Sequence, residues 1–138
     1  MRWLRYETDS REHYGIIEGN EVVEVTGDPF AGYQTTRIKH KLNDVKFLVP
    51  VVPKTFYAAG LNYPEHVTEA AKKLGREPEL PKEADIGYRA NNALIAHGET
   101  IVIPHDAGEL VQYEAELVAV IGTKAKHLSE RDALSCVL

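Results

Sequence analysis

The chain has 138 residues, of which 43% are hydrophobic and 27% are charged, and its formal net charge is −5. This length is typical of one ordinary domain with a real core, and this composition argues against a disordered, collagen-like or coiled-coil chain. Nucleic acid and anionic membranes are poor partners, because 16 Lys and Arg stand against 21 Asp and Glu and no dense basic run is present.

The cysteine content and the hydropathy indicate a compartment. Cys136 is the one cysteine, so an intramolecular disulfide cannot form, and we expect a reducing, cytoplasmic location. The sequence has no run of 18 apolar residues, which excludes a spanning helix. The first seven residues become charged before an apolar signal core develops, so we expect no export signal.

The N-terminal part of the sequence is typical of a small β-rich unit. Short apolar runs predict strands over residues 3–7, 14–18 and 21–25. The Gly19-Asn20 pair between the last two runs indicates a hairpin. The polar stretch 31–46 predicts no particular element. Residues 47–53, interrupted by two prolines, favour an extended connector. We therefore expect a boundary between an N-terminal unit, residues 1–50, and the remainder, residues 51–138.

The remainder predicts short strands and two helices. The strands are expected over residues 55–59, 87–90, 101–104 and 110–121. A helix is expected over residues 64–74, because Pro64 suits the first turn, lysines occupy the last turn, and Gly75 ends it. Residues 76–85 are charged and contain two prolines, which is typical of a loop. A capping box beginning at Ser129 predicts a C-terminal helix.

Two glutamates alternate along the strand predicted at 110–121. Positions i and i+2 share one face of a strand, so Glu114 and Glu116 point the same way, with Cα atoms about 6.5–7 Å apart. Val118 and Val120 continue this face, where two like charges repel and lose hydration. A hard divalent cation (Mg²⁺, Mn²⁺ or Ca²⁺) removes both costs, because it prefers oxygen ligands. The alternative is an edge strand whose glutamates face water.

A histidine and a glutamate lie three residues apart in the helix predicted at 64–74. His66 and Glu69 are therefore neighbours on the helix surface. A carboxylate beside an imidazole orients the ring and fixes its tautomer, and such a pair can take a proton from water or from a carbon acid. The alternative is an ordinary polar pair on a solvated helix face.

A cation follows in the strand predicted at 87–90. Arg89 can hold a substrate carboxylate through two parallel hydrogen bonds. The alternative is an ordinary surface arginine.

These elements, in this order, resemble the fumarylacetoacetate hydrolase family from about residue 45 to the end. The matching stretches are Ala59-Gly60-Leu61-Asn62-Tyr63 with His66 and Glu69, Tyr88-Arg89 with Asn92-Ala93-Leu94-Ile95, Gly98 with Ile101-Val102-Ile103-Pro104, and Tyr113-Glu114-Ala115-Glu116-Leu117 with Val120-Ile121-Gly122. The combined order is far more specific than any single motif. It favours the functional interpretation over the structural alternative for the two glutamates, for the His66 and Glu69 pair, and for Arg89.

The resemblance implies a mixed β-roll with peripheral helices, assembled as a homodimer, of which residues 51–138 form the first part. It implies that Glu114 and Glu116 bind Mg²⁺ or Mn²⁺, with Ca²⁺ as a substitute, and that His66 and Glu69 form an acid/base dyad. Tyr63 and Arg89 are expected to bind substrate. The implied substrates are small 2-oxo acids, acylpyruvates or β-diketones of aromatic catabolism. Hydrolytic C–C cleavage is the leading reaction, and isomerisation or decarboxylation is the alternative.

Two departures from the family pattern bear on the site. Family members carry lysine where Arg89 stands, so only an anchoring or electrostatic role carries over. The family places a third carboxylate ligand, in an Asn-Asp pair, beyond the position of Leu138, and neither Asp106 nor Asp132 matches that motif. A second hypothesis follows: these residues are an incomplete, non-catalytic chain that pairs with another polypeptide.

Overall fold

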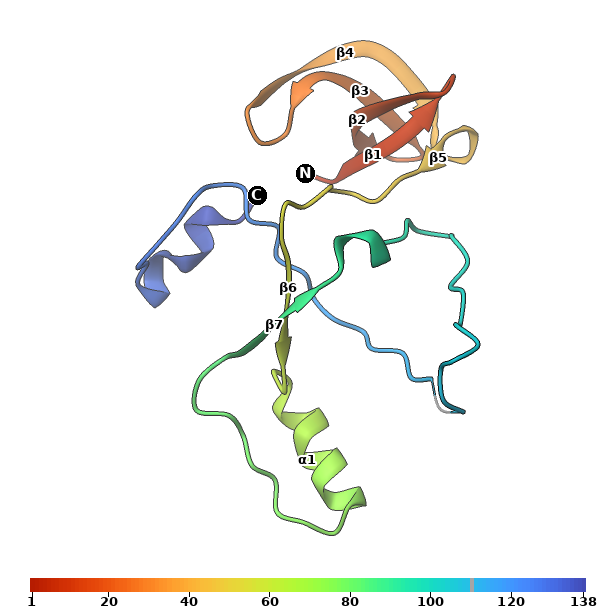
Figure 1. The fold of residues 1–138 in the computed structure, drawn as a ribbon. Helices are drawn as coiled ribbons and strands as arrows, with labels where there is room; N and C mark the ends of the chain where they lie inside the picture. Colours follow the sequence, from red (N-terminus) through yellow and green to blue (C-terminus); the bar gives the residue numbers. More distant parts are fainter. Residues whose placement is uncertain (110) are drawn as a thin grey trace. The chain divides into compact units, whose positions relative to one another are not determined.

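The computed structural model describes residues 1–109 and 111–138, whose path is drawn in Figure 1. They divide into two compact units, one formed by Met1–Val51 with Ile95–Leu138 and the other by Val52–Leu94. Antiparallel strands are the main regular structure of the described residues, in which α1 (Pro64–Lys73) is the one α-helix. The predicted class, α+β and mostly β, is confirmed. No helix in these ranges is both long and apolar enough to cross a bilayer.

The first unit begins with a five-stranded antiparallel sheet in the order β4-β3-β2-β1-β5. Its strands are β1 (Trp3–Thr8), β2 (Arg11–Glu18), β3 (Glu21–Asp28), β4 (Gly32–Lys41) and β5 (Lys46–Phe47), drawn in red to yellow in Figure 1. The first three strands and the hairpin at Gly19 confirm the prediction from sequence. The 3₁₀ turn η1 (Leu42–Asp44) links β4 to β5.

One face of this sheet carries a cluster of core residues. Leu4, Tyr6 and Val22 are buried together, and Tyr6 and Val22 are 0% exposed. Four partly buried side chains pack against them: Ile17, Leu42, Val45 and Phe47. Gly15 lies opposite Leu4 on this face, and a Cβ at residue 15 would come within 2.4 Å of Val22 Cγ2. Glycine is therefore required there for close packing.

The same face ends in a polar cluster around the Tyr6 ring. The Glu24 carboxylate lies 3.2 Å from His13 Nδ1 and 3.9 Å from His40 Nε2, and the two imidazoles lie 5.5 and 5.7 Å from the Tyr6 ring. Burial, with a smaller contribution from the Glu24 charge, raises the pKa of Tyr6 to about 12. In the described part of the chain the phenol oxygen has no hydrogen bond of standard geometry, so this residue contributes chiefly as a buried neutral ring.

β4 is a strand that the sequence did not predict. It lies at the edge of the sheet and pairs with β3 in two registers, with a shift between Val23 and Val25. An edge strand exposes one side to solvent, so it tolerates a polar composition. This polar composition is the reason that the sequence did not predict the strand. Lys39 of this strand lies 3.1 Å from Glu18, which is the largest cause of the raised pKa of Lys39.

The second unit holds the remaining ladder and the helix. β6 (Phe56–Gly60) pairs antiparallel with β7 (Asp85–Arg89), and α1 with the loop after it connects the two strands (Figure 1). The strand, helix and loop predicted here are confirmed. The 3₁₀ turn η2 (Asn91–Ala93) follows, and the Asn91 side chain donates hydrogen bonds to the carbonyls of Pro53 (2.8 Å) and Lys54 (3.2 Å). These bonds join the two ends of the unit.

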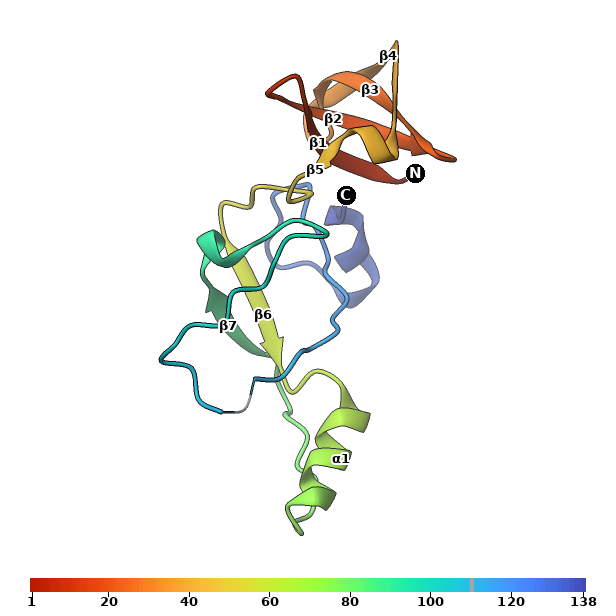
Figure 2. The same cartoon turned by 90° about the vertical axis from the view of Figure 1, so that its right-hand side faces the viewer.

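The strands predicted at 101–104 and 110–121 are wrong for the described residues, and Leu110 lies outside them. No ladder forms along residues 101–104 or 111–120, and pairing is limited to an isolated bridge between Ile121 and Val137. Figure 2 draws residues 111–121 as a plain blue trace without arrows. An extended segment becomes a strand only when a neighbouring backbone accepts its hydrogen bonds. The expected C-terminal helix is the 3₁₀ helix η3 (Glu130–Cys136), and Ser129 Oγ caps it by accepting from the Asp132 N–H at 3.3 Å.

Candidate functional site

The candidate acid/base pair lies on α1. Pro64 occupies the first turn, where its missing N–H is not needed, and Lys72 and Lys73 lie in the last turn. His66 and Glu69 are exposed, and their i, i+3 spacing makes them neighbours on the helix surface. This arrangement leaves both side chains open to a small molecule.

The opposite side of α1 faces its own loop. Val67 and Ala71 are the buried residues of the helix, and they line a cavity of about 690 Å³ together with loop residues 76, 77 and 79–82. At about 100° per residue, Glu69 falls on the other side of the helix from Val67 and Ala71, and His66 lies at least a quarter turn away from both. Packing of the loop therefore orients the helix so that the pair points away from the loop.

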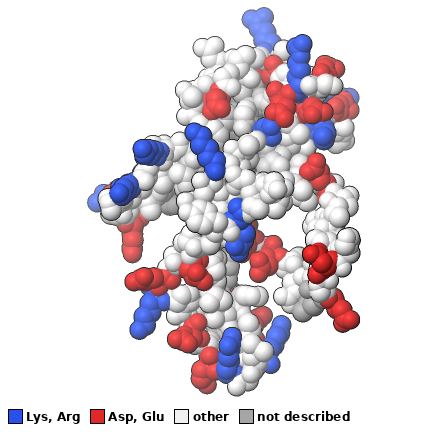
Figure 3. All heavy atoms as spheres, viewed as in Figure 1, with Lys and Arg blue, Asp and Glu red and all other residues white. Residues whose placement is uncertain are grey.

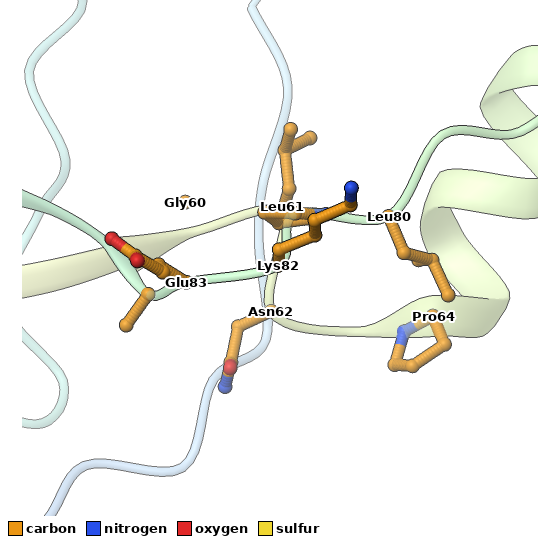
Figure 4. A pocket seen from close by; sticks show the side chains of 9 residues that line it. Gly60, Leu61, Asn62, Pro64, Leu80, Lys82 and Glu83 are labelled. Carbon is orange, nitrogen blue, oxygen red and sulfur yellow. The ribbon is translucent and has the colours of Figure 1, made fainter.

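A second cavity, of about 290 Å³, lies where β6 leads into α1. Figure 4 shows its lining side chains, among them Asn62 before the helix, Pro64 at the first position of the helix, and Lys82 and Glu83 in the loop. The Lys82 and Glu83 side chains extend to opposite sides of the view (Figure 4). Leu61, at this junction, has a positive φ of 51°, which is uncommon for a branched residue. His66 and Glu69 are not among the residues that line this cavity.

Arg89 is positioned by the β6–β7 ladder. It lies opposite Phe56, whereas Tyr88 lies opposite Tyr57, so Arg89 and Tyr88 occupy different faces of the sheet. Its Nη1 donates to the Tyr88 carbonyl at 3.2 Å. Gly87 leaves room for the guanidinium, since a Cβ at that position would lie 3.3 Å from Nη1. The side chain is exposed, as an anchor for an anion must be.

The two predicted substrate-binding residues both belong to the second unit. Tyr63 is the N-cap residue of α1, has an extended backbone and is 43% exposed. The Tyr88 ring, which is adjacent to Arg89, lies 5.0 Å from the ring of Tyr57, and the hydrogen bond between these phenols is the largest cause of the raised pKa of Tyr57. Tyr63 and Arg89 thus occupy the start of the helix and the end of β7.

The two candidate metal ligands lie in the first unit. Glu114 and Glu116 are exposed, in a stretch that forms no strand, so the expected buried strand face is not observed. Residues 1–109 and 111–138 contain no group of three or more His, Cys, Asp and Glu that could hold a metal ion. The carboxylate chemistry suits Mg²⁺ or Mn²⁺, and the pair supplies two ligands rather than a complete set.

Side chains of both charge signs lie on the visible surface. Figure 3 shows acidic and basic side chains interspersed on the visible face, with no extended basic stripe.

Comparison with known proteins identifies the family. Residues 55–138 match the family model described as "Fumarylacetoacetate (FAA) hydrolase C-terminal", and residues 1–50 match the model described as "Rv2993c-like, N-terminal". The chain therefore belongs to the fumarylacetoacetate hydrolase family.

Two relatives illustrate the similarity to this family. A fumarylacetoacetate hydrolase domain-containing protein 2 homolog of Dictyostelium discoideum is 38% identical over 96 residues, covering 70% of this chain and 29% of that protein. The homoprotocatechuate catabolism bifunctional isomerase/decarboxylase of Escherichia coli is 32% identical over 124 residues, covering 88% and 27%. This chain thus spans less than a third of either relative. The latter name describes an enzyme of aromatic catabolism.

A solved structure matches along the whole chain. The 5-carboxymethyl-2-hydroxymuconate delta-isomerase from Mycobacterium smegmatis shares the fold with a TM-score of 0.83 and 28% identity, covering 100% of this chain and 52% of that chain. The match confirms the fold class predicted from sequence. It also shows that this chain spans about half the length of its structural relative.

Two structural features of the site had no clear signal in the sequence. Lys82 lines both cavities, although the composition of its loop indicates only a solvent-exposed segment. Asn91 joins the two ends of the second unit through its side-chain hydrogen bonds. A charged loop and a lone asparagine acquire such roles only through the fold around them.

Proposed function

We propose that the protein is a divalent-metal-dependent enzyme that acts on a small 2-oxo acid, acylpyruvate or β-diketone, with hydrolytic C–C cleavage as its leading reaction. The observation that carries the proposal is the exposed His66 and Glu69 pair, which α1 presents within the part of the chain that matches the hydrolase family model.

The dyad moves the proton. Glu69 orients the His66 imidazole, which accepts a proton from the attacking water and later returns it to the leaving carbon. Arg89 holds a substrate carboxylate as a permanently charged anchor, and Tyr63 lines the approach to the helix. Both substrate contacts keep the reacting carbonyl close to the base and reduce the entropy lost in the reaction.

Glu114 and Glu116 are the residues of this chain that we assign to the cation. Mg²⁺ or Mn²⁺, when bound, supplies Lewis-acid polarisation of the substrate carbonyl. The two carboxylates are oxygen donors of the type such hard ions prefer, and their joint negative charge favours a divalent cation.

A second candidate is isomerisation or decarboxylation of a related acid. It is favoured by the Escherichia coli isomerase/decarboxylase and the Mycobacterium smegmatis isomerase among the relatives. The same dyad would then deliver its proton to a substrate carbon, and water would not attack. Analysis of the products distinguishes these reactions: hydrolysis adds water and gives two organic fragments, decarboxylation releases CO₂ and leaves one shorter acid, and isomerisation leaves the molecular mass unchanged.

The test combines turnover with metal binding. The protein is assayed with acylpyruvate, oxaloacetate and diene-dioate substrates in the presence of Mg²⁺ or Mn²⁺. We expect His66→Ala to lower turnover by roughly 10²–10⁴-fold and to leave Mn²⁺ affinity unchanged, whereas Glu114→Ala abolishes Mn²⁺ binding.

Exposed residues outside the assigned site provide the matched controls. His127→Ala and Glu109→Ala should change neither turnover nor metal binding. The absence of turnover on all three substrate classes would contradict the function. The reverse pattern of the two main variants would contradict the roles.

A further inference from the structure

The larger of the two cavities lies behind α1, between the helix and the loop that follows it. We call it the rear cavity, and its lining consists of Leu61, Val67, Ala71 and loop residues 76, 77 and 79–82. The loop runs back along the helix toward β7 (Figures 1 and 2). The volume of about 690 Å³ falls within the range of about 300–1,000 Å³ that is typical of small-molecule sites.

One wall of the rear cavity is apolar. Val67 and Ala71, on the helix, are 7% and 3% exposed and form a fixed floor. Leu61 and Leu80 are 55% and 48% exposed, and Pro81 lies beside Leu80 in the loop. The floor is thus covered, whereas the leucines still have apolar surface in contact with water. A small apolar molecule in this cavity would remove that surface from water, which is favourable.

The turn at the end of α1 holds the loop in place behind the helix. Gly75 has a positive φ of 65°, and its N–H donates to the Lys72 carbonyl at 3.1 Å. The Arg76 N–H donates to the Ala71 carbonyl, also at 3.1 Å. These two bonds form a Schellman motif, and two prolines further restrict the loop. The backbone of Arg76 is therefore fixed next to the floor of the cavity.

The charges around the rear cavity favour an anion. Residues 72–82 carry four Lys and Arg and two Glu, a net charge of +2 in a chain whose net charge is −5. Arg76 and Lys82 line the cavity, as do Glu77 and Glu79. In the part of the chain that the structure describes, neither cation has a carboxylate within 4.0 Å. A guanidinium that is free of such a partner can bind a carboxylate through two parallel hydrogen bonds.

We propose that the rear cavity is a second binding site, which takes a small apolar carboxylate. The apolar wall receives the hydrocarbon body, and Arg76 and Lys82 bind the carboxylate. Glu69 falls on the other side of α1, so the bound molecule is distinct from the substrate that meets the acid/base pair. This inference goes beyond the proposed function and does not rest on it.

The probe is 3-phenylpropanoate, titrated into the full 138-residue chain without added metal and followed by NMR. We expect one-to-one binding with a Kd of about 1 mM or tighter, and the largest shifts at Val67, Ala71 and Leu80. The neutral 3-phenylpropanamide and the cationic 3-phenylpropylamine should bind about tenfold or more weakly. An acid that fails to bind, an amide that binds equally well, or an amine that binds more tightly would overturn the proposal.

Matched variants test each part of the site. Arg76→Gln and Lys82→Gln should each weaken binding of the acid by about threefold to tenfold, whereas Lys73→Gln, outside the lining, should not change it. Leu80→Asp should weaken binding by about tenfold or more, whereas Leu74→Asp, at a residue that is 67% exposed and outside the lining, should not. The other amide resonances check that each variant is folded. Equal effects within either set would overturn the proposal.

A variant of the proposed substrate anchor separates the two sites. Arg89→Gln should leave the affinity for 3-phenylpropanoate unchanged, because Arg89 does not line the rear cavity. Loss of binding in this variant would place the probe at the substrate anchor and overturn the second site. A protein that turns over a 2-oxo acid but does not bind the probe contradicts only the second site. A protein that binds the probe and turns nothing over contradicts only the proposed function.

Discussion

The N-terminal sheet (β1 to β5) and the exposed segment (residues 111–121) contain similar apolar side chains, which are buried in the sheet and exposed in the segment. In the sheet, Tyr6 and Val22 are 0% exposed, and each strand between β4 and β5 has a partner on both sides. In the exposed segment, Tyr113 is 95% exposed and Val118 is 66% exposed, and no ladder forms before Ile121. The comparison shows that an alternating apolar pattern specifies a strand only where backbone partners and a cover are supplied.

The largest expected difference between the two regions comes from removing a tyrosine ring in each. Tyr6→Ala should lower the free energy of unfolding of the sheet by about 3–5 kcal/mol, because it leaves a cavity in the core. Tyr113→Ala should change it by no more than about 0.5 kcal/mol. Urea unfolding followed by Trp3 fluorescence measures both, and equal effects would break the comparison.

Alkaline titration tests the burial of Tyr6 more finely. Its folded pKa of about 12 lies above the ordinary value of 10.0, so its stabilising contribution is complete below pH 10 and is lost as the pH rises through 12. The loss is at most about 3 kcal/mol, from roughly 1.4 kcal/mol per pKa unit. We expect the urea midpoint to fall over this range by less in Tyr6→Phe than in the unchanged chain. Parallel curves for the two proteins would show that the phenol is not desolvated.

A methyl group at two glycines tests packing density. Gly15→Ala should cost about 1–3 kcal/mol, since its Cβ would clash with Val22 Cγ2 and the Val23 carbonyl. Gly108→Ala meets nothing within 4 Å and should stay within about 1 kcal/mol of the unchanged chain. Thermal unfolding of both variants is the measurement, and a neutral Gly15→Ala would mean that the sheet is loosely packed.

The smallest expected effect concerns local order at the C-terminal end. Ser129→Ala removes the cap of η3 and should cost about 0.5–1 kcal/mol locally, seen as faster amide exchange at Asp132. Unfolding of the N-terminal sheet should not change, because the cap is a local contact. A shift in the Trp3 transition would show that the two regions unfold together.

Elements with local signals were predictable from the sequence. The Gly19 turn specified the β2–β3 hairpin, Pro64 and Gly75 bounded α1, and Ser129 capped η3. Their spacing also placed His66 beside Glu69 on one helix. β4 was missed because an edge strand exposes a polar side, and the strand at 110–121 was overpredicted because its pattern depends on a distant neighbour.

The sequence by itself determined the family, the mostly β class and the identity of the candidate chemical groups, because these depend on residue type and short spacing. Only the tertiary structure decided which strands pair, that Gly15 must accommodate Val22, and that His66 and Glu69 point away from the loop packed behind α1. It also decided that Glu114 and Glu116 share no strand face in these residues. The physical reason is that a strand, unlike a helix, satisfies its backbone hydrogen bonds through segments far away in sequence.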